Sequence, residues 1–150
     1  MLPSALLQLP APSGVGRAPA AASDRPAVLI VEDDPGISRM LKLVFQRAAL
    51  PAIAAGDGAE ALQLFGRHAA TVALVFVDCC LPDMDGGALC RRLRELAPGM
   101  PVILASGYGH RSAYETLMAE GPTIFLAKPF LPTELAGHAR ALLSGSDQAA

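Results

Sequence analysis

Short apolar runs rich in β-branched residues recur along the chain and alternate with segments of helical spacing. Each run is four to six residues long and lacks alternating polar positions, which is typical of strands covered on both faces of a sheet. The runs lie at 27–31, 52–55, 72–77, 101–106 and 123–127. Strands that alternate with helices predict an α/β fold, with a parallel five-stranded sheet, right-handed crossovers and helices on both faces.

The segments between and after these runs predict five helices, each with one apolar face. The first follows Asp34, a suitable N-cap, and begins with Pro35, which the first helical turn tolerates. The fourth helix lies around 111–120, and the fifth opens at Pro132. The residues expected to face inward are Ile37, Met40, Leu41, Val44, Phe45 and Ala48 in the first helix, Ala61, Leu62, Leu64 and Phe65 in the second, Leu89, Leu93 and Leu96 in the third, and Leu135, Ala139, Leu142 and Leu143 in the fifth.

Polar residues follow the apolar runs at the points where the strands should end. The first run leads into Glu32 and Asp33, the third into Asp78, the fourth ends in Ser106, and the fifth leads into Lys128. The carboxyl ends of parallel strands share one edge of the sheet, and ligands of open α/β sheets bind outside that edge. We therefore expect these side chains to form one site, although they are far apart in the sequence.

The residue types at this edge predict phosphoryl chemistry. Carboxylates of Glu32, Asp33 and Asp78 would repel one another, which raises at least one pKa unless a cation neutralises them. Oxygen ligands at an open rim suit Mg²⁺, and a lysine or a hydroxyl near them can hold phosphoryl oxygens. A carboxylate nucleophile beside a divalent cation and Lys128 is the arrangement that acyl-phosphate formation at an aspartate needs.

Four stretches together resemble the receiver domain of bacterial response regulators in two-component signalling. They are "VLIVEDDPGI", "VFVDCCLPDMDGG", "PVILASGYG" and "FLAKPF", each at the end of its expected strand. The resemblance covers roughly residues 26–145, the expected domain, and leaves a disordered Ala/Pro-rich tail at 1–25 and a short tail at 146–150. It implies a flavodoxin-like, doubly wound (βα)5 fold with strand order 2-1-3-4-5.

The resemblance also implies a role for each site residue. Asp78 matches the aspartate that takes a phosphoryl group from a phosphohistidine of a histidine kinase or a histidine phosphotransfer protein. Asp33 matches the direct Mg²⁺ ligand, Glu32 the acid that holds the metal through water, and Cys80 the residue that ligates it through its carbonyl. Ser106 matches the switch hydroxyl. Lys128 matches the phosphate-pairing lysine, and the proline that follows it is often preceded by a cis peptide bond. Phe125 matches the rotating aromatic residue of the switch.

The function that follows is signalling rather than conventional catalysis. Phosphorylation is expected to change how the face of the fourth helix, fifth strand and fifth helix binds a downstream protein. Only "GSDQAA" remains after the expected fifth helix, so we expect a single-domain regulator that signals by protein contact. Phe125 lacks the hydroxyl that many relatives have, so an inward rotation of the ring would make no hydroxyl contact. Cys80 and Tyr108 flank the route of the attacking water in this family, and neither would readily orient a water, which predicts a long-lived acyl phosphate.

Two other functions stay open at this stage. A receiver-fold protein-interaction module that is never phosphorylated is the main alternative. The "DMDG" segment, with Asp83 and Asp85, is similar to the paired aspartates of haloacid-dehalogenase-type phosphatases, but those acids should directly follow a strand. We interpret Asp83 and Asp85 as turn residues, with Gly86 and Gly87 supplying positive φ.

Composition and charge narrow the picture further. The chain has 150 residues, enough for one domain with a complete core, and a formal net charge of -2, which argues against a nucleic-acid-binding surface. No run approaches the roughly 18 apolar residues of a membrane span, so we expect a soluble, cytoplasmic protein without membrane partners.

Cys79, Cys80 and Cys90 form an odd set, interpreted as reduced thiols, with Cys79 and Cys80 on opposite faces if the strand continues. A redox-active Cys80 beside the site is the less favoured alternative.

Overall fold

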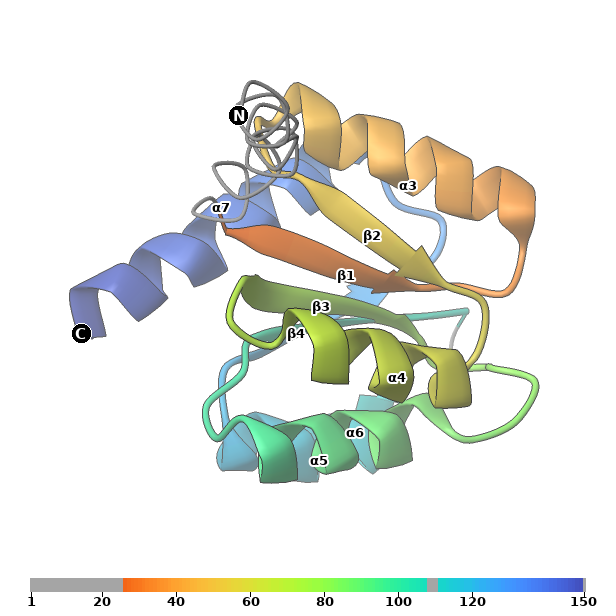
Figure 1. The fold of residues 1–150 in the computed structure, drawn as a ribbon, viewed down its shortest axis with the longest axis vertical. Helices are drawn as coiled ribbons and strands as arrows, with labels where there is room; N and C mark the ends of the chain where they lie inside the picture. Colours follow the sequence, from red (N-terminus) through yellow and green to blue (C-terminus); the bar gives the residue numbers. More distant parts are fainter. Residues whose placement is uncertain (1–25, 108–110, 150) are drawn as a thin grey trace, which may run out of the picture.

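The computed structural model describes residues 26–107 and 111–149 (Figure 1). The predicted tail at 1–25 lies outside these residues, as does Tyr108, one of the two positions expected to flank the water route. None of the helices in the described part of the chain combines the length and apolarity needed to cross a bilayer.

Five parallel strands form the sheet in the order β2-β1-β3-β4-β5, as expected. The strands are β1 (Ala27–Val31), β2 (Ala52–Ala55), β3 (Val72–Asp78), β4 (Val102–Ser106) and β5 (Thr123–Ala127). β3 includes Asp78, and β4 begins one residue after Pro101, whose nitrogen has no hydrogen to donate to a neighbouring strand. All five residues of β1 and of β4 are buried, as a sheet covered on both faces requires.

Two layers of helices cover the sheet. On one face lie α3 (Pro35–Arg47) and α7 (Pro132–Ala149), and on the other lie α4 (Gly58–His68), α5 (Gly86–Leu96) and α6 (Arg111–Glu120) (Figure 1). Asp34 caps α3 as predicted, since its Oδ1 accepts hydrogen bonds from the backbone nitrogens of Gly36 and Ile37. α7 continues through Ala149, so the helix extends over most of the segment 146–150 that we expected to be a tail.

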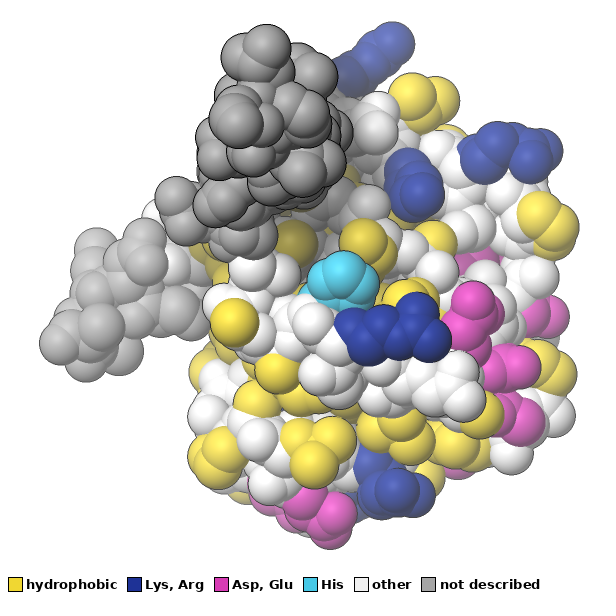
Figure 2. Space-filling view, in the orientation of Figure 1, with side chains coloured by type: hydrophobic (Ala, Val, Ile, Leu, Met, Phe, Trp, Pro, Cys, Tyr) yellow, Lys and Arg dark blue, Asp and Glu magenta, His cyan; other side chains and the backbone are white. Residues whose placement is uncertain are grey.

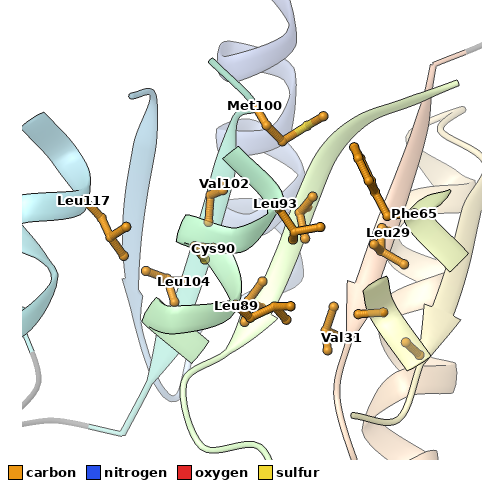
Figure 3. Packing of buried hydrophobic residues seen from close by; sticks show 14 of the residues in the cluster. Leu29, Val31, Phe65, Leu89, Cys90, Leu93, Met100, Val102, Leu104 and Leu117 are labelled. Atoms are coloured by element: carbon orange, nitrogen blue, oxygen red, sulfur yellow. The ribbon is translucent and has the colours of Figure 1, made fainter. Parts of the chain in front are cut away.

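The sheet separates two hydrophobic clusters, because successive strand residues point to opposite faces. In β1, Leu29 and Val31 point toward α4 and α5, whereas Val28 and Ile30 point toward α3 and α7. Figure 3 shows the first cluster, in which side chains from the helices meet those of β1 and β4. Burial of these apolar surfaces is the main force that holds the layers together.

Three predicted core positions are wrong. Ile37 and Met40 of α3 are 38% and 41% exposed, because they border an apolar groove instead of packing under another element. Leu96 is 62% exposed. The buried stripe of α5 continues from Leu93 to the half-buried Ala97, so Leu96 lies to one side of it.

A buried cation that the sequence analysis missed joins α5 to its neighbours. Arg94 is only 8% exposed, and it replaces Leu96 in the buried stripe. Burial lowers the pKa of its guanidinium group. The guanidinium donates to the carbonyl oxygens of Met100 (3.1 Å), Leu117 (2.8 Å) and Pro122 (2.6 Å) and to Oγ1 of Thr123 (2.8 Å). One side chain therefore links the ends of α5 and α6 to the starts of β4 and β5.

Candidate functional site

The predicted site residues meet at the carboxyl edge of the sheet. Glu32 and Asp33 follow β1, Asp78 is the last residue of β3, Ser106 is the last residue of β4, and Lys128 follows β5. Acidic side chains gather on the side of the molecule where the strands end (Figure 2). The parallel topology thus brings together groups that are separated by up to 96 positions between Glu32 and Lys128.

Three carboxylates form the centre of this site. Glu32, Asp33 and Asp78 each offer one carboxylate oxygen, and these three oxygens lie within 4.8 Å of one another. Glu32 and Asp78 are 3% and 5% exposed, whereas Asp33 is exposed and keeps the cluster open to solvent. This geometry agrees with the predicted crowding of acids at the rim.

Glu32 has a raised pKa and, within the part of the chain that the structure describes, one unpaired oxygen. Its Oε2 accepts a hydrogen bond from the backbone nitrogen of Asp34 at 3.1 Å, but its buried Oε1 has no hydrogen-bond partner among the described residues. Burial raises the pKa of Glu32 to about 7; the Asp34 hydrogen bond opposes this rise, and the charge of Asp78 adds to it. Repulsion between the acids, from which we expected a raised pKa, contributes less to the pKa of Glu32 than burial does.

Lys128 partly balances the acids. Its Nζ lies 3.2 Å from Oδ1 of Asp78, and its side chain is 34% exposed. Burial lowers the pKa of Lys128, but the hydrogen bond to Asp78 and the charges of Asp78 and Glu32 outweigh burial, so the pKa is raised and the amine stays protonated. The peptide bond between Lys128 and Pro129 is cis, as the resemblance implied.

The backbone after Asp78 turns out of the sheet at once. The nitrogen of Cys80 donates to Oδ1 of Asp78 at 3.2 Å, which fixes the orientation of that carboxylate. The strand ends at Asp78, so Cys79 and Cys80 do not alternate between two faces. The condition under which we expected them on opposite faces is therefore not met, and their Sγ atoms lie 3.4 Å apart.

Asp83 and Asp85 have structural roles that sequence reasoning only partly found. Asp83 accepts hydrogen bonds from the backbone nitrogens of Gly58 (2.9 Å) and Ala59 (3.0 Å), so it caps α4, which begins 25 residues earlier. The hydrogen bond from Gly58 is the main reason that the pKa of Asp83 is lowered. Asp85 caps α5 through the nitrogen of Ala88 at 3.1 Å. The acids of "DMDG" are therefore both helix caps.

Gly86 is required for close approach rather than for positive φ. A Cβ atom at this position would lie 2.8 Å from the carbonyl oxygen of Asp78 and 2.8 Å from Cα of Cys79. Among the described glycines only Gly99 has a positive φ, so the reason that we gave for Gly86 and Gly87 is wrong. The start of α5 packs directly against the end of β3, which positions Asp78.

The two predicted switch residues lie on neighbouring strands. Ser106 is fully buried at the end of β4, and its carbonyl oxygen accepts a hydrogen bond from the backbone nitrogen of Lys128 at 2.8 Å. Phe125 on β5 is half-buried and packs against Tyr114 of α6, with ring centroids 6.1 Å apart. Tyr114 was not predicted, although an aromatic residue facing β5 from α6 is compatible with its helical spacing.

The residues at this site fit a magnesium ion. The donors are oxygens, as Mg²⁺ prefers, and one side of the cluster is open for water ligands. The buried Oε1 of Glu32, which has no hydrogen-bond partner within the described ranges, is an acceptor that a hydrated cation would satisfy. The raised pKa of Glu32 also indicates that a positive charge is favourable here.

Comparisons with known proteins agree with the fold. A family model described as the response regulator receiver domain matches residues 28–140. The chain is 31% identical, over 122 residues, to the probable transcriptional regulator ycf27 of Porphyridium aerugineum; the match covers 81% of this chain and 50% of that protein. It is also 32% identical, over 120 residues, to the sensor kinase CckA of Brucella abortus, covering 80% of this chain and 13% of the kinase. The chain spans half, or less, of the length of these curated relatives.

A solved structure shows the same architecture. The receiver domain of the Francisella response regulator 1452 superimposes with a TM-score of 0.72 and 28% sequence identity, and the match covers 81% of this chain and 99% of that domain. The fold, the strand order and the family match lead to the same conclusion. The chain belongs to the response regulator receiver domain family of two-component signalling.

Proposed function

We propose that the protein accepts a phosphoryl group on Asp78 in a His-Asp phosphorelay. The observation that carries this proposal is the position of Asp78, at the end of β3, with Nζ of Lys128 at 3.2 Å from one of its oxygens and two further acids beside it. The donor in this proposal is a phosphohistidine on a histidine kinase or a histidine phosphotransfer protein. The similarity to a sensor kinase and to transcriptional regulators supports a role between such partners.

The proposed step is a displacement at phosphorus. A carboxylate oxygen of Asp78 forms a bond to phosphorus, the P–N bond to the histidine breaks, and the imidazole leaves with the electron pair. Lys128 pairs with an oxygen of the transferred group, and the Ser106 hydroxyl donates a hydrogen bond to another. Glu32, Asp33, Asp78 and the carbonyl of Cys80 would hold a Mg²⁺ ion, which would compensate the negative charge of the phosphoryl group.

The output in this proposal passes through the face formed by α6, β5 and α7. Lys128 directly follows β5, and its backbone nitrogen donates to the carbonyl oxygen of Ser106. A movement of Lys128 or Ser106 toward a phosphoryl group would therefore displace the end of β5 and favour a new position of Phe125. A protein target that binds this face would then distinguish the two states.

The test uses a small-molecule donor, so that no partner has to be known. Purified protein is incubated with acetyl phosphate and Mg²⁺, and the intact mass is measured. We expect a gain of one phosphoryl group in the wild type and in Asp83→Asn, a matched aspartate in the same loop, but none in Asp78→Asn. If the wild type gains no phosphoryl group at saturating donor, the chain acts as a receiver-fold interaction module and the proposal is wrong.

A second assay, which measures phosphate release from phosphate monoesters, tests the phosphatase alternative. Asp83 and Asp85 are both engaged as helix caps, which leaves neither of them placed as a nucleophile after a strand. We therefore expect no phosphate release from unrelated phosphate monoesters. Once the adduct is formed, its decay after donor removal tests the prediction of a long-lived acyl phosphate. A half-life of only seconds would contradict that prediction.

A further inference from the structure

Two thiols lie side by side next to Asp78, and the proposed phosphoryl transfer uses neither side chain. Sγ of Cys79 and Sγ of Cys80 are 3.4 Å apart. Cys80 is exposed, so it is accessible to a reagent in solution, whereas Cys79 is buried behind it. The third thiol, Cys90, lies on α5 and is fully buried in the hydrophobic cluster between this helix and the sheet (Figure 3). The arrangement of the first two is that of an attacking thiol and a resolving thiol.

We propose that Cys79 and Cys80 form an oxidation site, at which a hydroperoxide converts the two thiols into a disulfide between adjacent residues. The sulfur atoms need to approach each other by roughly 1.4 Å to reach the S–S bond length. The short distance between the two Sγ atoms means that the change starts within the two cysteines and the peptide group between them. The close pair thus favours an intramolecular product over a disulfide with a second molecule.

The hydroperoxide is the only oxidant that this reaction needs. The sulfur of Cys80 attacks the outer peroxide oxygen, the O–O bond breaks, and an alcohol or water leaves, which converts Cys80 to a sulfenic acid. The sulfur of Cys79 then attacks that sulfur, and the sulfenic oxygen leaves as water. In sum, two thiols and one hydroperoxide give one disulfide, one alcohol and one water. The pKa of Cys80 is raised, mainly by its hydrogen bond to Cys79, so the reaction requires excess hydroperoxide.

The peptide group between the two cysteines connects this site to Asp78. Its nitrogen, from Cys80, donates to Oδ1 of Asp78 at 3.2 Å, and its carbonyl oxygen, from Cys79, accepts from the nitrogen of Gly86 at 3.1 Å. A disulfide between adjacent residues closes a small ring around this peptide and rotates it away from its relaxed geometry. Oxidation is therefore expected to release the Asp78 carboxylate and to shift the carbonyl of Cys80.

The bond should also be easily reduced. Adjacent Cα atoms are about 3.8 Å apart across a trans peptide, which is shorter than the roughly 4.4–6.8 Å that most disulfides span. Such a bond is strained, and strained disulfides have more oxidising potentials than structural ones. The pair is thus expected to form a reversible site rather than a permanent crosslink.

Intact mass and thiol counting test the site directly. Protein treated with excess hydrogen peroxide and then freed of it is expected to lose two hydrogens and two titratable thiols, and dithiothreitol is expected to restore both. Cys90→Ala should behave in the same way, whereas Cys79→Ala should stop at a sulfenic acid on Cys80 or form a linked dimer. A wild type that gains oxygen without losing hydrogens, or that forms dimers through Cys80, would overturn the inference.

A separate experiment measures how oxidation of the two cysteines changes the phosphorylation rate of Asp78. This part of the inference rests on the proposed function. Reduced and oxidised protein are incubated with acetyl phosphate and Mg²⁺, and the oxidised form is expected to be phosphorylated more slowly, by on the order of tenfold, with recovery after reduction. If the reduced protein gains no phosphoryl group, the proposed function fails while the mass result still decides the oxidation site. If oxidised and reduced protein react at equal rates, the pair does not act on Asp78.

Discussion

Replacing Glu32 by glutamine removes a charge that the folded protein holds in an unfavourable position. The side chain is 3% exposed, and its pKa rises from 4.5 to about 7 because of burial first and the Asp78 charge second, against the Asp34 hydrogen bond. Each pKa unit corresponds to about 1.4 kcal/mol, so ionised Glu32 costs the folded state about 3 kcal/mol at pH 8. Glutamine keeps an acceptor for the nitrogen of Asp34 and offers a donor to the neighbouring acids.

The sign of the effect follows from protonation in the two states. Well below pH 4.5 the carboxyl group is protonated in both the folded and the unfolded protein, and the cost is absent. The cost grows as the pH rises from 4.5 to about 7, because the unfolded protein ionises first, and it is constant at higher pH. We therefore expect Glu32→Gln, without metal, to be about 3 kcal/mol more stable than the wild type at pH 8 and about 1 kcal/mol more stable at pH 5.

Urea denaturation in the presence of a chelator measures this difference. Glu95→Gln is the matched control, because Glu95 is exposed on α5 and its replacement should change the free energy of unfolding little at either pH. Saturating Mg²⁺ should stabilise the wild type more than Glu32→Gln and narrow the gap between them. The reasoning is refuted if Glu32→Gln is no more stable than the wild type at pH 8 without metal, or if the difference does not depend on pH.

Two further predictions concern the packing around the site. Arg94→Leu removes four hydrogen bonds of a buried guanidinium group. The carbonyl oxygens of Leu117 and Pro122 keep donors in Thr123 and Val102, whereas that of Met100 loses its side-chain donor. We therefore expect a loss of about 3 kcal/mol in the free energy of unfolding, measured with urea, whereas the exposed Arg92→Leu should change it little. Equal effects of the two substitutions would contradict the role of Arg94. Asp83→Ala removes the acceptor of the backbone nitrogens of Gly58 and Ala59 and leaves the N-cap residue of α4, Asp57, in place, so amide hydrogen exchange at Gly58 and Ala59 should become faster. Unchanged exchange at both would show that these two hydrogen bonds are dispensable.

The strands and the site were predictable because they depend on patterns that are local in the sequence. An apolar run that ends in a polar residue identifies both a buried strand and its carboxyl end, and parallel topology then places Asp33, Asp78 and Lys128 at one edge of the sheet, whereas the strand order came from the resemblance. The strand bounds consequently differ from the prediction by one residue at two places, at Asp78 and at Pro101.

The features that were missed depend on contacts between distant segments. Helical spacing identifies an apolar face, but it does not reveal that the buried stripe of α5 passes through Arg94 and leaves Leu96 exposed, since this depends on acceptors in α6 and β5. The cap that Asp83 supplies to α4 bridges 25 residues, so no local motif indicates it. The neighbouring thiols of Cys79 and Cys80 follow from where the chain leaves the sheet, which the apolar run alone leaves open.

The two capping aspartates make the connection between β3 and α5 a poor place to insert foreign sequence. Asp83 and Asp85 tie this loop to two helix starts, so a reporter inserted there would strain both helices and displace Asp78. Ala69 and Ala70 are exposed in the connection between α4 and β3, at the opposite edge of the sheet. A fluorescent domain or an epitope tag placed between them would leave the carboxyl edge intact, so a biosensor built on this chain should carry its reporter at that position.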